Sequence, residues 1–207
     1  MNQMNPLNVT EAINKHHLYI TTDGKQGTPA NLNCCMLYDS IIEDVNLHGI
    51  FFNDSKLMNA TFRKVQLQYA TFAYALLKKA TFIDCILYDV SFNCANLTCA
   101  VFKNVDLTYA SFIECDLTGA NLSSVSPKNL EGINLTHAVL NKTIFPKKDM
   151  NLGKLYSVVK TKIFLDRKIQ GLVCLISYNE SSMDLLDSSG ILHKNLPSWL
   201  KFSMKEV

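Results

Sequence analysis

The side chains with which this sequence could do chemistry are seven cysteines and five histidines among its 207 residues. A zinc site needs four converging ligands at short spacings, and a nucleophilic site needs a cysteine or serine next to a histidine. The sequence has no Cys-x-x-Cys pair, and its histidines show no recognisable nucleophilic order with a cysteine or serine. The segment Gly24-Lys25-Gln26-Gly27 lacks the spacing of a phosphate-binding loop. We therefore expect no catalytic, cofactor-binding or metal-binding residues, and a protein that is not an enzyme.

The composition is that of a globular chain in a reducing compartment. Apolar residues make up 48% and charged residues 18%, so the chain can bury a core. An odd number of cysteines without paired spacing favours free thiols over a disulfide framework. The sequence contains no apolar run of about eighteen residues, and its first ten residues do not resemble a secretory signal. We expect a cytoplasmic protein without a membrane span, and delivery into a host cell stays open.

The elements that must position these side chains are set by an internal repeat of five residues. This period matches neither the 3.6 of a helix nor the 2 of a single strand. Nineteen successive positions carry Leu, Ile or Phe, namely Leu32, Leu37, Ile42, Leu47, Phe52, Leu57, Phe62, Leu67, Phe72, Leu77, Phe82, Leu87, Phe92, Leu97, Phe102, Leu107, Phe112, Leu117 and Leu122. The position two residues before each of them is small or β-branched and never charged.

Tripeptides such as Ala60-Thr61-Phe62 and Ala95-Asn96-Leu97 resemble the signature of the pentapeptide-repeat family. The family motif is a small residue, a polar residue, a central Leu or Phe, and two variable positions. The resemblance covers residues 30–124. It implies an all-β solenoid, a right-handed quadrilateral β-helix with four pentads in each coil and both anchor residues pointing inward. Residues twenty apart would then stack, so that Phe lies on Phe and Leu on Leu.

Each coil of such a rod contacts only its neighbours, so both open ends need caps. We assign residues 1–29 to a short N-terminal capping helix and turn. Asn8 and Glu11 have the spacing of a capping box, and Val9, Ile13, His16 or His17, and Ile20 form one helical face.

The repeat β-helix is assigned to residues 30–145, with a register break near 123–129 where three extra residues interrupt the wall. Residues 146–207 lack the repeat. We expect them to form a mixed C-terminal segment that is either a cap or a surface for homodimerisation. Within it, 155–165 and 169–178 predict a hairpin.

The charges bear on the kind of partner. Residues 30–125 carry nine acids and six bases, a net charge of −3. The family resemblance implies one known role, in which an acidic rod mimics DNA in the binding groove of a topoisomerase such as gyrase. A rod of about 23 Å would replace duplex carrying about 13 phosphate charges, which this balance imitates poorly. A DNA-mimic modulator of a topoisomerase or another DNA-binding enzyme is therefore the alternative function.

Tyrosines at outward positions give the first hypothesis for function. Tyr69 and Tyr109 fall in one outward column, Tyr88 lies in the adjoining column of the same face, and Tyr74 follows at the next corner. Aromatic side chains on a rigid surface are favoured anchors for protein partners. The same rings could instead pack on one another and stiffen the wall. We expect a non-catalytic binding or scaffold protein, such as a bacterial or phage effector or adaptor, with a protein partner and no direct contact to nucleic acid.

Overall fold

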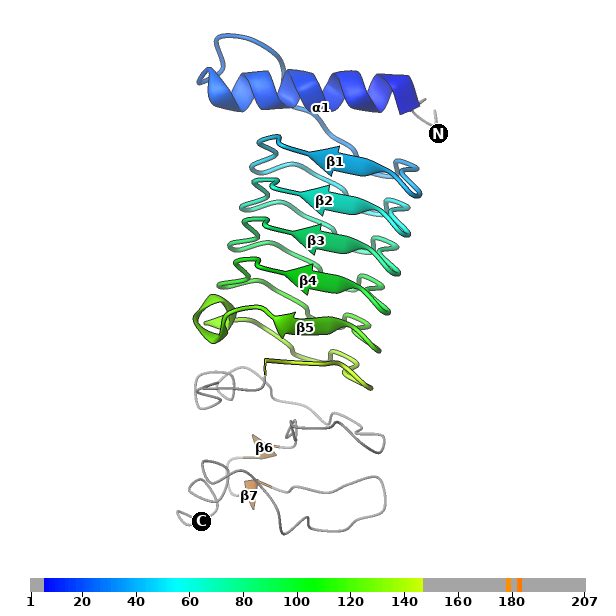
Figure 1. Cartoon of the computed structure of the whole chain (residues 1–207), viewed down its shortest axis with the longest axis vertical. Coiled ribbons are helices and arrows are strands. Elements are labelled where there is room, and N and C mark those ends of the chain that lie inside the picture. The colour runs from blue at the N-terminus through cyan, green and yellow to red at the C-terminus, as the bar shows by residue number, and fades with distance from the viewer. Residues whose placement is uncertain (1–5, 147–177, 180–181, 184–207) are drawn as a thin grey trace.

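The computed structural model describes residues 6–146, 178–179 and 182–183. From residue 6 to 146 the chain forms a rod of stacked coils with one helix lying across the first coil (Figure 1). The elements of this rod are α1 (Pro6–Thr21), β1 (Ile41–Glu43), β2 (Thr61–Arg63), β3 (Thr81–Ile83), β4 (Val101–Lys103), β5 (Asn121–Ser124) and the short 3-10 helix η1 (Pro127–Leu130). Over the described ranges, none of the helices combines the length and apolarity that crossing a membrane requires.

Strands β1 to β5 form one parallel sheet in sequence order, and the pairs within β1 to β4 join residues twenty positions apart. Between β4 and β5 the register shifts by one residue, so that Lys103 pairs with Ser124. Phe62 pairs with Phe82, and Phe82 with Phe102. Parallel bridges with the same offset join the coils on the other three faces, for example Asn31 to Phe51. The predicted right-handed quadrilateral β-helix is confirmed.

The core consists of the inward side chains that the five-residue period predicts. The Phe rings stack within each column, with centroids 4.9–5.2 Å apart and interplanar angles of 6–19°. Rings from the two opposite faces meet edge to face across the rod, at 5.7–6.3 Å and 73–88°. These geometries are the two that aromatic pairs prefer, so the interior is closely packed along its whole length.

The corners of the rod share one backbone conformation. Every fifth residue from Cys34 to Gly119 has a φ between 51° and 70°. Val, Ile and Thr are absent from these positions, because β-branched residues fit the left-handed region poorly. Tyr69, Tyr74 and Tyr109 occupy three of these corners.

The last described coil contains three extra residues. Beyond β5, bridged residues are 23 rather than twenty positions apart, as in Ser111 with Asn134 and Asp116 with Val139. Helix η1 lies within this longer coil. The central side chains Leu130, Leu135, Leu140 and Phe145 are buried again, so the wall continues past the insertion.

The N-terminal helix begins earlier than the sequence predicts. The capping box at Asn8 is wrong, because α1 already begins at Pro6, a residue type that suits the first helical turn since it has no N–H to satisfy. In the C-terminal segment 146–207, β6 (Tyr178–Asn179) pairs antiparallel with β7 (Ser182–Met183). The hairpin over 155–178, apart from Tyr178, and the choice between cap and dimerisation surface lie outside the described residues.

Candidate protein-binding surface

Four aromatic side chains from successive coils form a continuous stack on the outside of the rod. We call His48, Tyr69, Tyr88 and Tyr109 the aromatic column. Their ring centroids are 5.2 Å apart from His48 to Tyr69, 5.7 Å from Tyr69 to Tyr88, and 5.5 Å from Tyr88 to Tyr109. The interplanar angles of 60°, 73° and 89° make every contact edge to face. The sequence predicts that the three tyrosines share this face, but it does not predict that His48 joins them.

The column depends on two alternating sequence positions. His48 and Tyr88 follow the central residue of their pentads directly, whereas Tyr69 and Tyr109 follow one position later, at the corner. Coils lie only about 4.8 Å apart, so alternation gives each ring room to turn its edge to the next. Tyr69 and Tyr109 each keep 50% of their surface exposed, and Tyr88 is half-buried between them.

A glycine forms the floor of the column. A Cβ on Gly132 would lie 2.3 Å from Cδ1 of Tyr109, so the ring rests where any larger residue would put a side chain. Gly132 also has a φ of 70°, which favours glycine independently. The sequence pattern did not identify this contact, because Gly132 belongs to the longer coil after the register break.

The surroundings of Tyr88 raise the pKa of its phenol. Partial burial raises the pKa of Tyr88, and the neighbouring Tyr69, Tyr109, Asp89 and Asp106 raise it further. Asp106 itself accepts hydrogen bonds from the Thr108 backbone N–H at 3.0 Å and from the Thr108 hydroxyl at 2.6 Å. The Tyr88 phenol therefore stays neutral at neutral pH, with Asp89 and Asp106 close to it.

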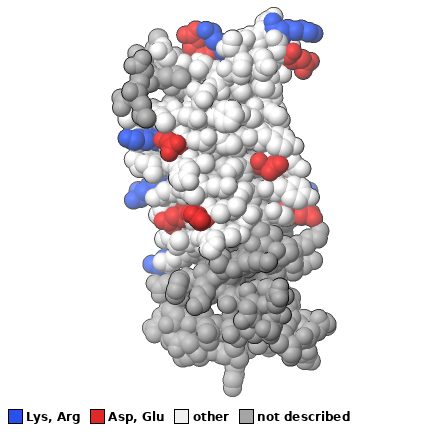
Figure 2. Space-filling view, turned by 180° about the vertical axis from the view of Figure 1, so that it is seen from behind, with Lys and Arg blue, Asp and Glu red and all other residues white. Residues whose placement is uncertain are grey.

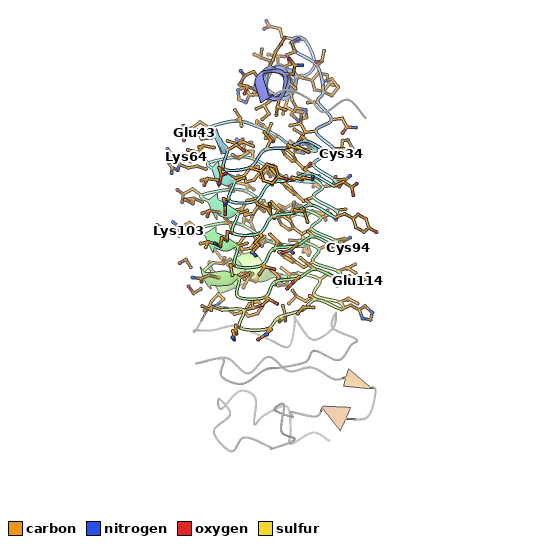
Figure 3. The ribbon with its side chains drawn as sticks, turned by 90° about the vertical axis from the view of Figure 1, so that its right-hand side faces the viewer. Cys34, Glu43, Lys64, Cys94, Lys103 and Glu114 are labelled. Carbon is orange, nitrogen blue, oxygen red and sulfur yellow. The ribbon has the colours of Figure 1, made fainter. Side chains whose placement is uncertain are left out.

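Tyr74 lies on a different corner from the other three tyrosines. It is 62% exposed, and its pKa is raised first by a hydrogen bond with Cys94 and then by the charges around it. The Cys94 thiol in turn donates to Oε2 of Glu114 at 3.8 Å. Figure 3 shows Cys34, Cys94 and Glu114 along one edge of the rod, opposite Glu43, Lys64 and Lys103. The structure thus separates Tyr74 from the aromatic column.

The inward cysteines are unsuited to chemistry. Burial raises the pKa of Cys35, Cys85 and Cys115, in the case of Cys85 to about 11. Their thiols stay protonated at neutral pH, whereas nucleophiles and metal ligands are thiolates. Within residues 6–146 and the two short strands, no three His, Cys, Asp or Glu side chains gather closely enough to bind a metal ion.

Two histidines of α1 close the first coil, a role that the sequence reasoning missed. The Nδ1 atom of His16 accepts the Ala30 backbone N–H at 3.0 Å, and its Nε2–H donates to the His48 carbonyl at 3.1 Å. The Nδ1 atom of His17 accepts the Asn46 N–H at 2.8 Å. These backbone groups lie on the coil edge that has no preceding coil to pair with, so imidazoles replace the missing ladder. Burial lowers the pKa of His16, which keeps the ring in the neutral form that can accept.

These coils define a class of protein, the β-solenoids built from four short faces in each turn. The sequence model for pentapeptide repeats matches residues 85–123 in eight copies. Residues 85–123 are therefore pentapeptide repeats, and the same period and stacking extend over the neighbouring coils. No curated protein matches the chain.

Solved structures of three pentapeptide-repeat proteins are similar to this chain. Rfr23, from the cyanobacterium Cyanothece 51142, shares 17% identity with a TM-score of 0.45, covering 66% of this chain and 99% of its own. HetL, involved in heterocyst differentiation regulation in Nostoc sp. strain PCC 7120, shares 24% with a TM-score of 0.36, covering 58% of this chain and 61% of its own. QnrB1, a plasmid-mediated fluoroquinolone resistance protein, shares 20% with a TM-score of 0.38, covering 70% of each chain.

Proposed function

We propose that this pentapeptide-repeat protein is a non-catalytic binding or scaffold protein that holds a protein partner through the aromatic column. The form of this role that we propose is an adaptor or effector of a bacterium or phage, acting in the cytoplasm. One observation carries the proposal: three tyrosines stack on the outside of the rod, and two of them leave half of their surface exposed. Tyr74 belongs to the proposed site only for a partner broad enough to reach its separate corner.

The rigidity of the wall supports this role. Backbone hydrogen bonds between coils hold the three tyrosines, Tyr69 N–H donating to the Tyr88 carbonyl at 3.1 Å and Tyr109 N–H to the Glu131 carbonyl at 2.8 Å. A partner therefore meets rings that are already ordered, and binding costs little conformational entropy. Buried aromatic anchors at such interfaces contribute about 2 kcal/mol or more each.

The arrangement of charge supports protein binding over the DNA-mimic alternative. A DNA mimic needs a continuous row of carboxylates in place of phosphates. On the face formed by β1–β5, carboxylates instead pair with bases, Glu43 with Arg63 at 3.8 Å and Asp44 with Lys64 at 3.9 Å. Figure 2 shows the opposite side of the rod as a largely uncharged surface, with scattered acidic and basic residues and no acidic stripe.

The test is capture of partners from cell lysate at low and high salt. The variant Y69S/Y88S/Y109S keeps the inward ladders intact, and we expect it to bind a captured protein about a hundredfold more weakly than the unchanged protein does. The control D39N/D44N/D54N removes carboxylates that mimicry would require. Loss of binding in the control with retention in the tyrosine variant would refute the proposal in favour of mimicry. Strong weakening by salt would point the same way.

A further inference from the structure

The face that carries the aromatic column differs in charge from the face formed by β1–β5. Its outward residues in the first four coils lie in the ranges 46–49, 66–69, 86–89 and 106–109. These ranges contain two carboxylates, Asp89 and Asp106, and no lysine or arginine. Both carboxylates act on the Tyr88 phenol, so they lie beside the column.

Neither of these two carboxylates forms an ion pair within the described residues. Among the ion pairs of residues 6–146, none involves Asp89 or Asp106, whereas Glu43 and Asp44 on the β1–β5 face each have a basic partner. Oδ1 of Asp106 accepts two hydrogen bonds from Thr108, and no hydrogen bond of the described residues engages its Oδ2. The aromatic column therefore lies in a local field that attracts cations.

We propose that the aromatic column, together with Asp89 and Asp106, binds an extended, arginine-bearing segment of the partner protein. This inference rests on the proposed function and specifies the chemistry of the partner. A guanidinium is planar, so it can lie against a tyrosine ring and donate two hydrogen bonds to a carboxylate. A lysine ammonium offers neither the plane nor the paired donors.

The spacing of the column suits such a segment. Tyr69 and Tyr109 belong to coils two steps apart, about 10 Å along the rod. In an extended chain, side chains on one side recur about every 7 Å, so two or three alternate arginines span the column and both carboxylates. Because the wall is rigid, the partner segment bears the ordering cost of binding.

The experiment measures the affinity of the full chain for three short peptides by fluorescence anisotropy at low salt. The first peptide has three arginines at alternate positions among serines, the second has lysines in their place, and the third has glutamates. We expect the arginine peptide to bind at least about threefold more tightly than the lysine peptide, and the glutamate peptide not to bind. With only two carboxylates involved, raising the salt from 0.05 to 0.5 M should weaken binding by no more than about tenfold.

Matched variants locate the binding site. Y69S/Y88S/Y109S and, separately, D89N/D106N should each weaken the arginine peptide at least about tenfold. The control D54N/Y74S removes a tyrosine and a carboxylate from a different corner and should leave the affinity unchanged. The asparagine changes are isosteric and at the surface, so they test the site even if the tyrosine variant is destabilised.

Several outcomes would overturn the inference. They are equal binding of the arginine and glutamate peptides, undiminished binding in D89N/D106N, and an equal loss in D54N/Y74S. The arginine peptide could fail to bind while capture from lysate still depends on the tyrosines. That result would reject the arginine-bearing partner and leave the proposed function standing. Light scattering without peptide could show self-association that Y69S/Y88S/Y109S abolishes. The occupant of the surface would then be a second copy of this chain, and the inference would be wrong.

Discussion

Aromatic rings stack along the same coils both inside the wall and outside it. Inside, Phe62, Phe82 and Phe102 occupy the same position of successive coils and lie nearly parallel, at 6–8°. Outside, the aromatic column alternates between two positions and meets edge to face at 60–89°. The inner stack repeats because the fold requires a large apolar side chain at every centre. The outer stack has no such requirement.

This difference indicates that a binding function is to be sought among the outward residues of a solenoid, which the fold does not require. Outward and corner positions elsewhere on the rod accept Asp, Asn, Lys, Cys or Gly, so the backbone imposes only the exclusion of β-branched residues at corners. A run of four aromatic residues at such positions is therefore not explained by folding alone. Exposed aromatic clusters of this kind are favoured anchors of protein interfaces, which is why the proposal rests on the outer stack.

The same charge should have opposite effects on folding in the inner stack and in the outer stack. Phe82→Asp puts a carboxylate between Phe62 and Phe102, where an unpaired charge costs several kcal/mol, so we expect an unfolded or insoluble protein. Tyr109→Asp is the matched control, because Asp is common at these corners, and it should leave the fold intact. Circular dichroism and the melting temperature measure both. A soluble Phe82→Asp protein with unchanged melting temperature would contradict the inward assignment.

A smaller effect is expected where the inner stack ends, at the first coil. His16→Leu keeps the ring's approximate volume but leaves the Ala30 N–H and the His48 carbonyl without their partner. An unsatisfied group costs about 1–3 kcal/mol when it is fully buried, and these two groups are partly buried. We expect the free energy of unfolding to fall by about 1–3 kcal/mol, with faster hydrogen exchange at Ala30.

The control for this variant is Asn14→Ala, on the exposed side of α1. It should change the unfolding free energy by less than about 0.5 kcal/mol. Equal effects of the two variants would show that α1 stabilises the rod by apolar packing and not through His16.

The inner stack could be predicted from the sequence, whereas the contacts of the outer stack and of the cap could not. Period five fixes Phe82 over Phe62 because both occupy the same position of identical coils. His48 escaped prediction because its contact with Tyr69 joins two different positions and depends on side-chain rotamers and corner φ angles. The contacts of His16 and His17 depend on the angle at which α1 docks, which the helical face alone does not set. The end of the chain beyond residue 146 has no repeat to guide prediction.

The stability of the first coil should depend on pH through His16. Burial lowers the pKa of His16 in the folded state, and no charged partner other than the imidazoles of His17 and His48 contributes to that shift. The unfolded chain therefore binds a proton more readily than the folded one, and the stabilisation is complete above the unfolded pKa of about 6.5. It is lost as the pH falls from there through the folded pKa. We expect urea-unfolding midpoints to decrease between about pH 7 and pH 5.

His16→Leu should flatten this pH profile, since it removes the group whose pKa changes on folding. A profile that stays equally steep in the variant would assign the pH dependence to other groups, such as His17 or the carboxylates.

The smallest effect distinguishes the floor of the outer stack from an otherwise similar glycine. Gly132→Ala and Gly49→Ala both place a Cβ on a residue with a φ of 70°, so each should cost about 1 kcal/mol for the backbone conformation alone. Only at Gly132 does the new Cβ meet a ring, 2.3 Å from Tyr109, whereas at Gly49 it meets no atom within 4 Å. We expect similar losses of unfolding free energy, but displacement of Tyr109 from Tyr88 only in Gly132→Ala. Ring-proton chemical shifts of the two tyrosines measure that displacement, because the edge-to-face contact places one ring in the other's shielding field. If Gly49→Ala shifts the same resonances as much, the outer stack does not rest on Gly132, and its order comes from the contacts between its own rings.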